Sequence, residues 1–411
     1  MKLTPSTLRC TLTLVVLSAL LFIAARPAQA AATETVLYNF AGTPDGALPE
    51  SGLASRNGNF YGTTKSGGAF GYGTVFELSP NGGGWNESVL YSFTGGTDGS
   101  GPAYGLIFDS AGNLYGTTTF GGANGLGEVF ELSPAGSNWT ETVLYSFAND
   151  GDGAEPESGL IFDAAGNLYG TNGYYPGTGS GTVFELSPSG GAWTEQTIYS
   201  FGYRGNILGL VMDTAGNIFG TSTDNVFKLS PDGKGGWNAT LIHTFAGGTK
   251  DGSAPEGVLA LDAAGNVYGA TYYGGKSNNG TVYKLSPVLT GKKKGTFTQK
   301  ILYSFKGGTK DGDAPEGGIV LDAAGNLYGT AFDGGGYNGG IVFELVAPAG
   351  TVKAYKEKVL WIFNLTDGNG PFGSTLILGS SGNLYGTTIG GGSSGSGCGG
   401  YGCGVVFEVT P

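Results

Sequence analysis

Short runs of apolar and β-branched residues, separated by glycine-rich polar stretches, fill the chain from about residue 35 to its end. One unit of this pattern holds four runs of four to eight residues, at 105–109, 113–119, 127–133 and 140–147. Each run is rich in β-branched and aromatic residues and is bounded by Gly, Pro, Asn or Asp, which is typical of β-strands. No stretch beyond residue 30 has a convincing helical periodicity. The sequence therefore predicts an all-β protein.

The second run of each unit contains a hexapeptide, Gly-Asn-Leu-Tyr-Gly-Thr at 112–117, that recurs with small changes. Its seven copies are spaced 49 to 60 residues apart and begin at Gly58, Gly112, Gly166, Gly216, Gly265, Gly325 and Gly382. A period of this size indicates a repeat architecture. The links between runs are short and rich in Gly, Pro, Asn and Asp, so neighbouring strands should be antiparallel.

Seven units of four strands predict a seven-bladed β-propeller over residues 31–411, with four antiparallel strands per blade. A β-solenoid is the competing architecture, but solenoid coils are usually shorter than these units. The two ends of the chain favour a closed ring. Residues 35–40 match the fourth run of a unit, whereas the last run, 405–409, matches the third. We expect Val36–Phe40 to pair with Val405–Val409 and to complete the last blade, which removes an exposed sheet edge.

Residues 1–30 differ from the rest of the chain. Two basic residues, Lys2 and Arg9, precede an apolar run over 11–25, and Ala28-Gln29-Ala30 fits the cleavage rule of a secretory signal peptide. A retained membrane helix is the weaker interpretation, because the apolar run is shorter than the roughly 20 residues that span a bilayer. The sequence thus predicts export, to the periplasm or the extracellular space, and no membrane span after cleavage.

Charge narrows the range of partners. The formal net charge is −12, and it becomes −15 without residues 1–30, which hold three basic residues and no acids. Nucleic acids and anionic lipids bind to clustered basic residues, so neither is an expected partner.

Two cysteines follow the signal segment, Cys398 and Cys403. Exported proteins fold in an oxidising compartment, and the two are near neighbours, so we expect a local disulfide between them. A metal site would need more thiolates or histidines, and the chain has one histidine, His243. His243 stands where five repeats have Tyr and one has Trp, which favours a packing role over a catalytic triad.

Aspartates that end the first run of five units have a structural interpretation, because a carboxylate there can accept backbone N–H groups of the following turn. They are Asp109, Asp163, Asp213, Asp262 and Asp322.

The complete unit reads Gly-Leu-Ile-Phe-Asp-x-Ala-Gly-Asn-Leu-Tyr-Gly-Thr, then Gly-Thr-Val-Phe-Glu-Leu-Ser-Pro, then Thr-Val-Leu-Tyr-Ser-Phe. This pattern resembles the repeat of the choice-of-anchor tandem repeat GloVer-containing family of bacterial proteins, and the resemblance extends from Val36 to Val409. It implies a secreted or surface protein whose activity is not established, and it supplies no catalytic residues. Family members end in varied anchoring segments, and the chain shows none after its last predicted strand at 405–409.

One face of the predicted propeller carries candidate binding chemistry. The link from one unit to the next contains Asp-Gly followed by Pro in six of seven cases: Asp45, Asp98, Asp152, Asp251, Asp311 and Asp367. The links between the second and third runs fall on the same face and carry many aromatic residues. Acids beside exposed aromatic rings suit sugar binding. Turn chemistry is the simpler interpretation of the Asp-Gly links. Residues 150–155, Asp-Gly-Asp-Gly-Ala-Glu, are the best candidate for calcium.

The fourth unit interrupts this face. Its leading link, 202–206, lacks the Asp-Gly and the Pro, and its second-to-third link shrinks to about Asp224-Asn225. We therefore predict a notch in the rim. Tyr174 and Tyr175 on one side and Tyr272 and Tyr273 on the other would stack on a glycan, with Asp152 and Asp251 bonding its hydroxyls. The alternative is that the tyrosines only cover their own loops.

These observations favour a monomeric, exported, non-enzymatic scaffold that binds a carbohydrate or a cell-surface partner. No phosphate loop, zinc motif or nicotinamide fingerprint occurs in its required context, and no cofactor is expected other than the calcium considered above. Two alternatives remain: an enzyme that acts on carbohydrate with paired carboxylates, and a structural component of the cell surface.

Overall fold

The computed structural model describes residues 31–411 except 174–180, 202–208, 393–397 and 399. The predicted signal peptide, residues 1–30, lies outside the described residues. Residues 32–411 form one compact unit. Among the described residues, no helix has the length and the apolar character needed to cross a membrane.

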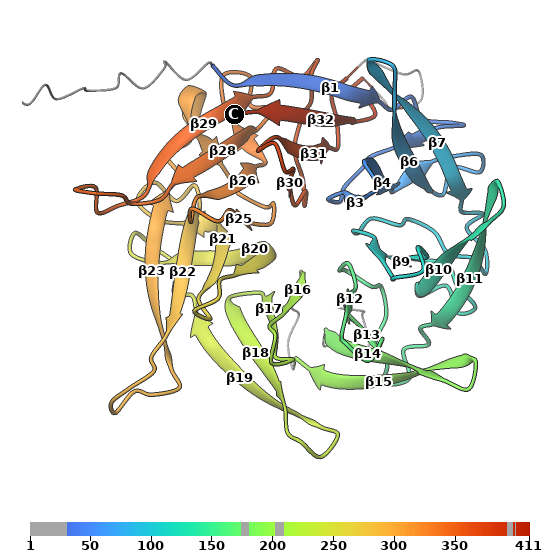
Figure 1. The fold of residues 1–411 in the computed structure, drawn as a ribbon, viewed down its shortest axis with the longest axis horizontal. Helices are drawn as coiled ribbons and strands as arrows, with labels where there is room; N and C mark the ends of the chain where they lie inside the picture. The colour runs from blue at the N-terminus through green and yellow to red at the C-terminus, as the bar shows by residue number, and fades with distance from the viewer. Residues whose placement is uncertain (1–30, 174–180, 202–208, 393–397, 399) are drawn as a thin grey trace, which may run out of the picture. The chain divides into compact units, whose positions relative to one another are not determined.

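Within the described residues, seven four-stranded antiparallel sheets follow one another around a ring, which confirms the predicted seven-bladed β-propeller (Figure 1). In six blades the strand nearest the ring centre comes first in the chain, and in the last blade it follows only the N-terminal strand. These inner strands are β3 (Ala54–Arg56), β8 (Ile107–Phe108), β12 (Ile161–Phe162), β16 (Leu210–Met212), β20 (Gly252–Leu261), β25 (Val320–Leu321) and β30 (Ile377–Leu378).

The other three positions of each sheet are filled in the same order in every blade. The second strands are β4 (Asn59–Thr64), β9 (Leu114–Thr118), β13 (Leu168–Asn172), β17 (Ile218–Ser222), β21 (Val267–Gly274), β26 (Leu327–Ala331) and β31 (Leu384–Thr388). The third are β6 (Thr74–Asn81), β10 (Glu128–Ala135), β14 (Thr182–Ser189), β18 (Asn225–Pro231), β22 (Thr281–Pro287), β28 (Ile341–Val346) and β32 (Val405–Thr410). The outer strands are β7 (Gly84–Ser92), β11 (Asn138–Ser146), β15 (Ala192–Ser200), β19 (Trp237–Thr244), β23 (Phe297–Ser304), β29 (Lys356–Ile362) and β1 (Thr33–Asn39).

The described links between the main strands contain two pairs of two-residue strands and one turn of 3-10 helix. β2 (Gly46–Ala47) pairs with β5 (Ser66–Gly67), and β24 (Gly312–Asp313) pairs with β27 (Asp333–Gly334). A single turn of 3-10 helix covers Gly308–Lys310. All of these lie in the links that precede an inner strand or follow a second strand, on the face where the sequence placed its candidate chemistry.

The recurring hexapeptide is explained by packing inside a blade. Its second glycine, Gly116 in blade 2, lies under the ring of Phe130 on the neighbouring strand, and a Cβ there would come within 2.6 Å of that ring. The strand therefore needs glycine at this point so that the buried phenylalanine can fill the blade core. Its first glycine, Gly112, has a φ of 101°, which glycine adopts without strain.

The turn between these strands uses the aspartate as predicted. Asp109 Oδ1 accepts hydrogen bonds from the backbone N–H groups of Gly112 and Asn113 at 2.7 and 2.8 Å. Two blades lack this aspartate, and a glutamate of the third strand replaces it. Glu77 accepts bonds from Asn59 and Tyr61, and Glu408 accepts bonds from Asn383 and Tyr385.

Aromatic side chains also hold adjacent blades together. The phenylalanine after each outer strand packs against the core aromatic of the next blade, as Phe93 does on Phe130 with 5.2 Å between ring centroids. The same contact closes the ring, because Phe40 after β1 packs on Phe76 at 5.0 Å. Such pairs stabilise beyond the area they bury.

The N-terminal strand completes the last blade, as predicted. β1 pairs antiparallel with β32, with Val36 opposite Phe407 and Asn39 opposite Val405. The two ends of the propeller thus belong to one sheet. Near them, Cys398 and Cys403 form the predicted disulfide, with their Cα atoms 5.2 Å apart.

Candidate functional site

The aspartates of the Asp-Gly links turn toward the outer strands and accept hydrogen bonds there. Asp152 is only 4% exposed; its Oδ2 accepts bonds from the Tyr145 hydroxyl and from the Ala148 N–H, both at 2.9 Å. Asp251 accepts the N–H groups of Ala246 and Gly252 at 3.0 and 2.8 Å. The same tyrosine-to-aspartate bond occurs at Asp45, Asp98 and Asp311. Turn chemistry therefore occupies these carboxylates in the described structure.

His243 takes the place of the tyrosine in this arrangement. Its Nε2 lies 3.4 Å from Asp251 Oδ1, and its ring packs edge-on against Phe245. His243 therefore contacts Asp251 in the way that the Tyr145 hydroxyl contacts Asp152. This agrees with a packing role for the histidine.

Two of the four predicted aromatic residues are described. Tyr272 and Tyr273 lie in β21, with ring centroids 4.4 Å apart, and Tyr273 is 49% exposed. Tyr174 and Tyr175 lie outside the described residues. The structure therefore places only one side of the predicted notch, and glycan stacking there remains a prediction.

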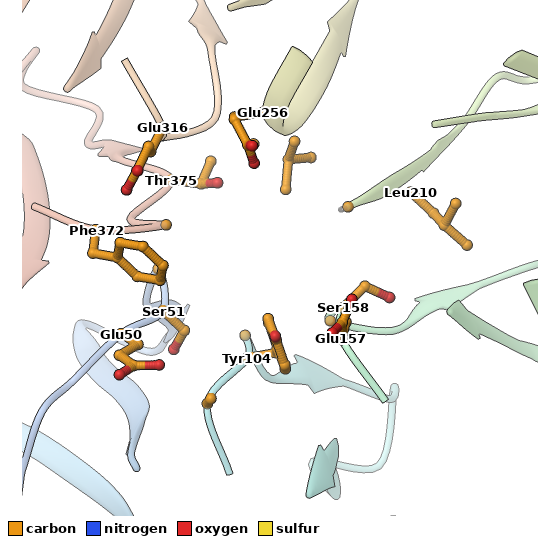
Figure 2. A pocket seen from close by; sticks show the side chains of 18 of the residues that line it. Glu50, Ser51, Tyr104, Glu157, Ser158, Leu210, Glu256, Glu316, Phe372 and Thr375 are labelled. Carbon is orange, nitrogen blue, oxygen red and sulfur yellow. The ribbon is translucent and has the colours of Figure 1, made fainter. Parts of the chain in front are cut away.

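The main cavity of the described residues lies at the centre of the ring, where the inner strands begin. Its volume is about 590 Å³, and residues from all seven blades line it. Figure 2 shows Glu50, Tyr104, Glu157, Glu256, Glu316 and Phe372 around one common space. Tyr272 and Tyr273 line it too, whereas Asp152 and Asp251 do not. We call this cavity the central pocket.

Its glutamates come from one position of the repeat. Each directly follows the proline of the link, so the chain reads Asp-Gly-x-x-Pro-Glu before the inner strand: Glu50, Glu157, Glu256 and Glu316. Ala103 and Phe372 hold this place in blades 2 and 7. The aspartate side chain bonds groups at the end of the outer strand, whereas the glutamate five residues later lines the central cavity. We call these four residues the inner glutamates.

Sequence reasoning missed the inner glutamates, although the signal was present. Four of the six links with Asp-Gly and Pro have Glu directly after the Pro. The sequence analysis assigned the ligand chemistry to the aspartates, whose carboxylates are bound within their own turns.

The inner glutamates differ in their charge partners. Lys65 Nζ lies 3.0 Å from Glu50 Oε2. For Glu157, Glu256 and Glu316 no ion pair occurs within the described residues, and Oε2 atoms of Glu157 and Glu316 are buried without a hydrogen-bond partner there. Three carboxyls are thus held near one another without a described counter-ion.

Burial and mutual repulsion raise the pKa of these three carboxyls. Burial, followed by the charge of Glu155, raises the pKa of Glu157 to about 7. Burial, followed by Glu157, raises the pKa of Glu256 to about 7. Burial, followed by Glu256 and Asp333, raises the pKa of Glu316 to about 8. The groups are therefore linked in a series across the pocket.

The rest of the wall is mostly apolar. Leucines directly before four of the inner strands line it: Leu53, Leu106, Leu160 and Leu376. Aromatic rings come from Tyr104, Tyr272, Tyr273 and Phe372. Burial, then the charge of Glu316, raises the pKa of Tyr272 to about 12. An apolar wall with a few convergent polar groups is the usual make-up of a small-molecule site.

The described residues include no group of three or more His, Cys, Asp or Glu side chains arranged to hold a metal ion. In the predicted calcium stretch, residues 150–155, Asp152 takes part in the turn described above, and calcium binding there stays a prediction.

The fold and the pocket define a class: a seven-bladed propeller with an acidic, apolar-walled pocket on its axis. The chain belongs to the Gloeobacter/Verrucomicrobia repeat family, whose sequence profile matches residues 25–226 and 205–411. No functionally curated protein is significantly similar to it.

Solved structures share the fold at low sequence identity. Virginiamycin B lyase from Staphylococcus aureus is 11% identical, over 92% of this chain and 99% of its own, with a TM-score of 0.55. A putative 6-phosphogluconolactonase from Bacteroides uniformis is 16% identical, over 80% of this chain and 88% of its own, with a TM-score of 0.52. At these identities the likeness concerns the fold alone.

Proposed function

We propose that this protein is an exported, non-enzymatic binding protein that takes a small organic molecule into its central pocket. The observation that carries the proposal is the convergence of the inner glutamates on one apolar-walled cavity of about 590 Å³. This volume lies in the range of small-molecule sites. Buried carboxyls without a partner are costly, and a ligand that satisfies them offsets that cost.

Binding is favoured over covalent catalysis by the state of the hydroxyl groups. Ser158 Oγ accepts the Thr171 N–H at 3.1 Å, and Ser51 Oγ lies 3.2 Å from Thr63 Oγ1. An activated hydroxyl nucleophile needs a base within hydrogen-bond reach. No histidine or lysine is among the described residues that line the pocket, and the two serine hydroxyls are bonded to threonines rather than to a glutamate.

A second candidate function, general acid–base catalysis by carboxyls, is favoured by one observation. Glu157 and Glu256 have pKa values near 7, where a carboxyl can both take and give a proton. The fold is shared with proteins described as a lyase and a putative lactonase. Conversion of a bound molecule, followed by NMR, distinguishes this function from binding alone.

The test is to close the pocket from its wall. A Cβ on Gly105, which lines the pocket, would meet no atom nearer than the Gly52 carbonyl oxygen at 3.9 Å. The variant Gly105→Leu therefore fills the pocket without a clash at Cβ, and Gly105→Ala is the matched control.

The probes are cellotriose, maltotriose, glucuronate and benzyltrimethylammonium, observed by saturation-transfer NMR with the mature chain. We expect at least one probe to bind the parent and Gly105→Ala with the same affinity. The same probe should not bind Gly105→Leu. The proposal fails if no probe binds or if binding survives the leucine. Silence toward every probe supports the structural surface component instead.

Export, a monomeric state and a glycan or surface-protein partner belong to the same proposal. The disulfide between Cys398 and Cys403 supports an extracellular or periplasmic location, because such bonds persist in oxidising compartments.

A further inference from the structure

We propose that the molecule bound in the central pocket is an organic cation: an amine or quaternary ammonium group carried on an apolar body. This inference rests on the proposed function and adds the class of ligand.

The first argument is charge. Among the described residues that line the pocket there are four glutamates and no lysine, arginine or histidine. Glu50 has a counter-ion in Lys65, at 3.0 Å, whereas no described residue pairs with the other three. A positive group between Glu157, Glu256 and Glu316 turns their mutual repulsion into attraction, whereas an anion adds to it.

The second argument is the aromatic side chains. Tyr272 and Tyr273 meet at 63° with centroids 4.4 Å apart, and both line the pocket on the side of Glu316. Tyr104 and Phe372 add rings from blades 2 and 7 (Figure 2). Rings attract cations over their faces, and rings beside carboxylates are the usual means of recognising ammonium groups that have lost their water.

The third argument separates an organic cation from a metal ion. A calcium ion takes six to eight oxygen ligands at close range. The described carboxyls form no group that could hold one, and much of the wall consists of leucine, isoleucine and valine side chains. Such a wall fits an apolar body attached to the charge.

The fourth argument separates the cation from a neutral sugar. A sugar offers and accepts many hydrogen bonds, so its site needs donors as well as acceptors. The charged groups of the described lining are carboxyls, which accept hydrogen bonds when ionised, and its side-chain donors are hydroxyls such as those of Tyr104, Ser158 and Thr375. These donors are few for the many oxygens of a sugar.

The experiment compares three probes that share a phenyl ring and differ in charge: benzyltrimethylammonium, benzyl alcohol and benzoate. Binding to the mature chain is measured by isothermal titration calorimetry at about pH 9, where the inner glutamates are ionised. We expect benzyltrimethylammonium to bind at least about tenfold more tightly than benzyl alcohol, because a cation–π contact and an ion pair each add to its affinity. Benzoate should not bind.

Charge removal is tested with a matched pair of variants. The double variant Glu256→Gln, Glu316→Gln keeps the size of both side chains and should weaken the cation roughly tenfold or more, since two attractive charges are lost. Glu87→Gln is the control, because burial likewise raises the pKa of Glu87 to about 7 but this residue lies on β7, away from the pocket. It should leave the affinity unchanged.

Acidification gives an independent readout. The groups that face one another here are Glu155 with Glu157, Glu157 with Glu256, Glu316 with Glu256 and Asp333, and Lys65 with Glu50. Each carboxyl that must lose its proton on binding lowers the affinity roughly tenfold per pH unit below its pKa. Binding of the cation should therefore fall steeply from about pH 9 to about pH 5, and that of benzyl alcohol should not.

Three results would overturn the inference: benzyl alcohol binding as tightly as the cation, unchanged cation binding in the double glutamine variant, or benzoate as the preferred probe. If cellotriose or maltotriose binds, is lost in Gly105→Leu and outcompetes the cation, the pocket is a sugar site. In that case the proposed binding function is supported, and the inference that the ligand is an organic cation is wrong.

Discussion

Two rings of carboxyls surround the same axis, and they behave differently. The inner glutamates lie on the central pocket. The outer acid pairs lie between blades, where the aspartate of an Asp-Gly link acts on a glutamate of the next outer strand. These pairs are Asp45 with Glu87, Asp98 with Glu141, Asp152 with Glu195, Asp311 with Glu357, and Asp367 with Glu34.

The pKa values of the two rings are alike. Burial, with the paired aspartate as a further cause, raises the pKa of Glu87 to about 7 and that of Glu34 to about 8. Burial and a neighbouring carboxyl do the same for Glu256 and Glu316. A raised pKa alone therefore does not distinguish a site from a structural element, although raised values gather at functional sites.

Their surroundings do distinguish them. The aspartate of an outer pair has its own donors: Asp45 accepts bonds from Tyr38, Ala41 and Gly46. The inner carboxyls face a cavity that can hold a molecule. The outer pairs are thus part of the blade contacts, whereas Glu157, Glu256 and Glu316 line the central pocket without an ion pair among the described residues.

Two blades lack a complete outer acid pair. The link before the fourth blade lacks the aspartate, and Ala239 stands where other blades have the glutamate. Before the fifth blade the aspartate is Asp251, and Gln299 replaces the glutamate, with Nε2 at 3.4 Å from Asp251 Oδ1. Both residues are thus absent at the fourth blade, whereas the fifth blade keeps the aspartate and has an uncharged amide in place of the glutamate.

The largest effect we expect is a loss of stability as pH rises. The folded chain holds these glutamate protons above the pH at which the unfolded chain releases them, near 4.5. Stability is therefore fully present below about pH 4.5 and is lost as pH rises through the folded pKa values of about 7 to 8. Calorimetry between about pH 5 and about pH 9 should show a melting temperature that falls by several degrees.

High salt is the control for this scan, because it screens surface repulsion but affects buried pairs less. A melting temperature that is highest at the alkaline end would contradict the raised pKa values in both rings.

The next largest effect concerns the aspartates of the outer ring. Asp152→Ala leaves the Tyr145 hydroxyl and the Ala148 N–H without their acceptor. We expect a loss of roughly 2–3 kcal/mol in the free energy of unfolding, typical of hydrogen bonds to a charged group. Urea denaturation measures it. Asp150→Ala, two residues away and exposed, is the control and should change little; equal losses in both variants would refute the anchoring role of Asp152.

A smaller effect comes from making or removing one acid pair. Glu87→Gln should raise the free energy of unfolding by about 1 kcal/mol at about pH 9, with solvent screening allowed for. Gln299→Glu should lower it by a similar amount, because it sets a new carboxylate beside Asp251. Both changes should vanish at about pH 5, where the glutamate is protonated. Urea denaturation at both pH values provides the measurement, and equal signs for the two variants would disprove the pairing.

The fold was predictable because the same pattern of strands and turns recurs in every repeat. Seven copies of the hexapeptide, with an outer-strand sequence at 35–40 and a third-strand sequence at 405–409, determined the blade number and the closure by β1 and β32. Local chemistry also sufficed for Asp109, whose partners lie within the next four residues.

The site was less predictable, because it depends on where the chain points after the proline. Asp152 and Glu157 are five residues apart and equally acidic in the sequence. Asp152 accepts a hydrogen bond from Tyr145, seven residues back along the chain. Glu157 instead lines the central pocket together with Glu256, which belongs to a blade two further around the ring. Such a shared cavity arises only when the ring closes, and no local pattern encodes it.

The smallest effect we expect tests whether the inner ring acts as a single unit. Glu256 is the second cause, after burial, of the raised pKa of Glu316, and Glu157 is the second cause for Glu256. Glu256→Gln removes the middle charge of this series, so the pKa of Glu316 should move down toward its ordinary value. Carbon-detected NMR titration of the glutamate carboxyls measures this shift.

The pKa of Glu87 should not move in the same variant, because the causes of its raised pKa are burial and the charge of Asp45. A shift at Glu87 of the same size would mean that the variant changes the whole propeller. An unmoved Glu316 would mean that the inner glutamates are independent acids, as the outer pairs are of one another, and the pocket would then lack the shared negative potential on which binding of a cation depends.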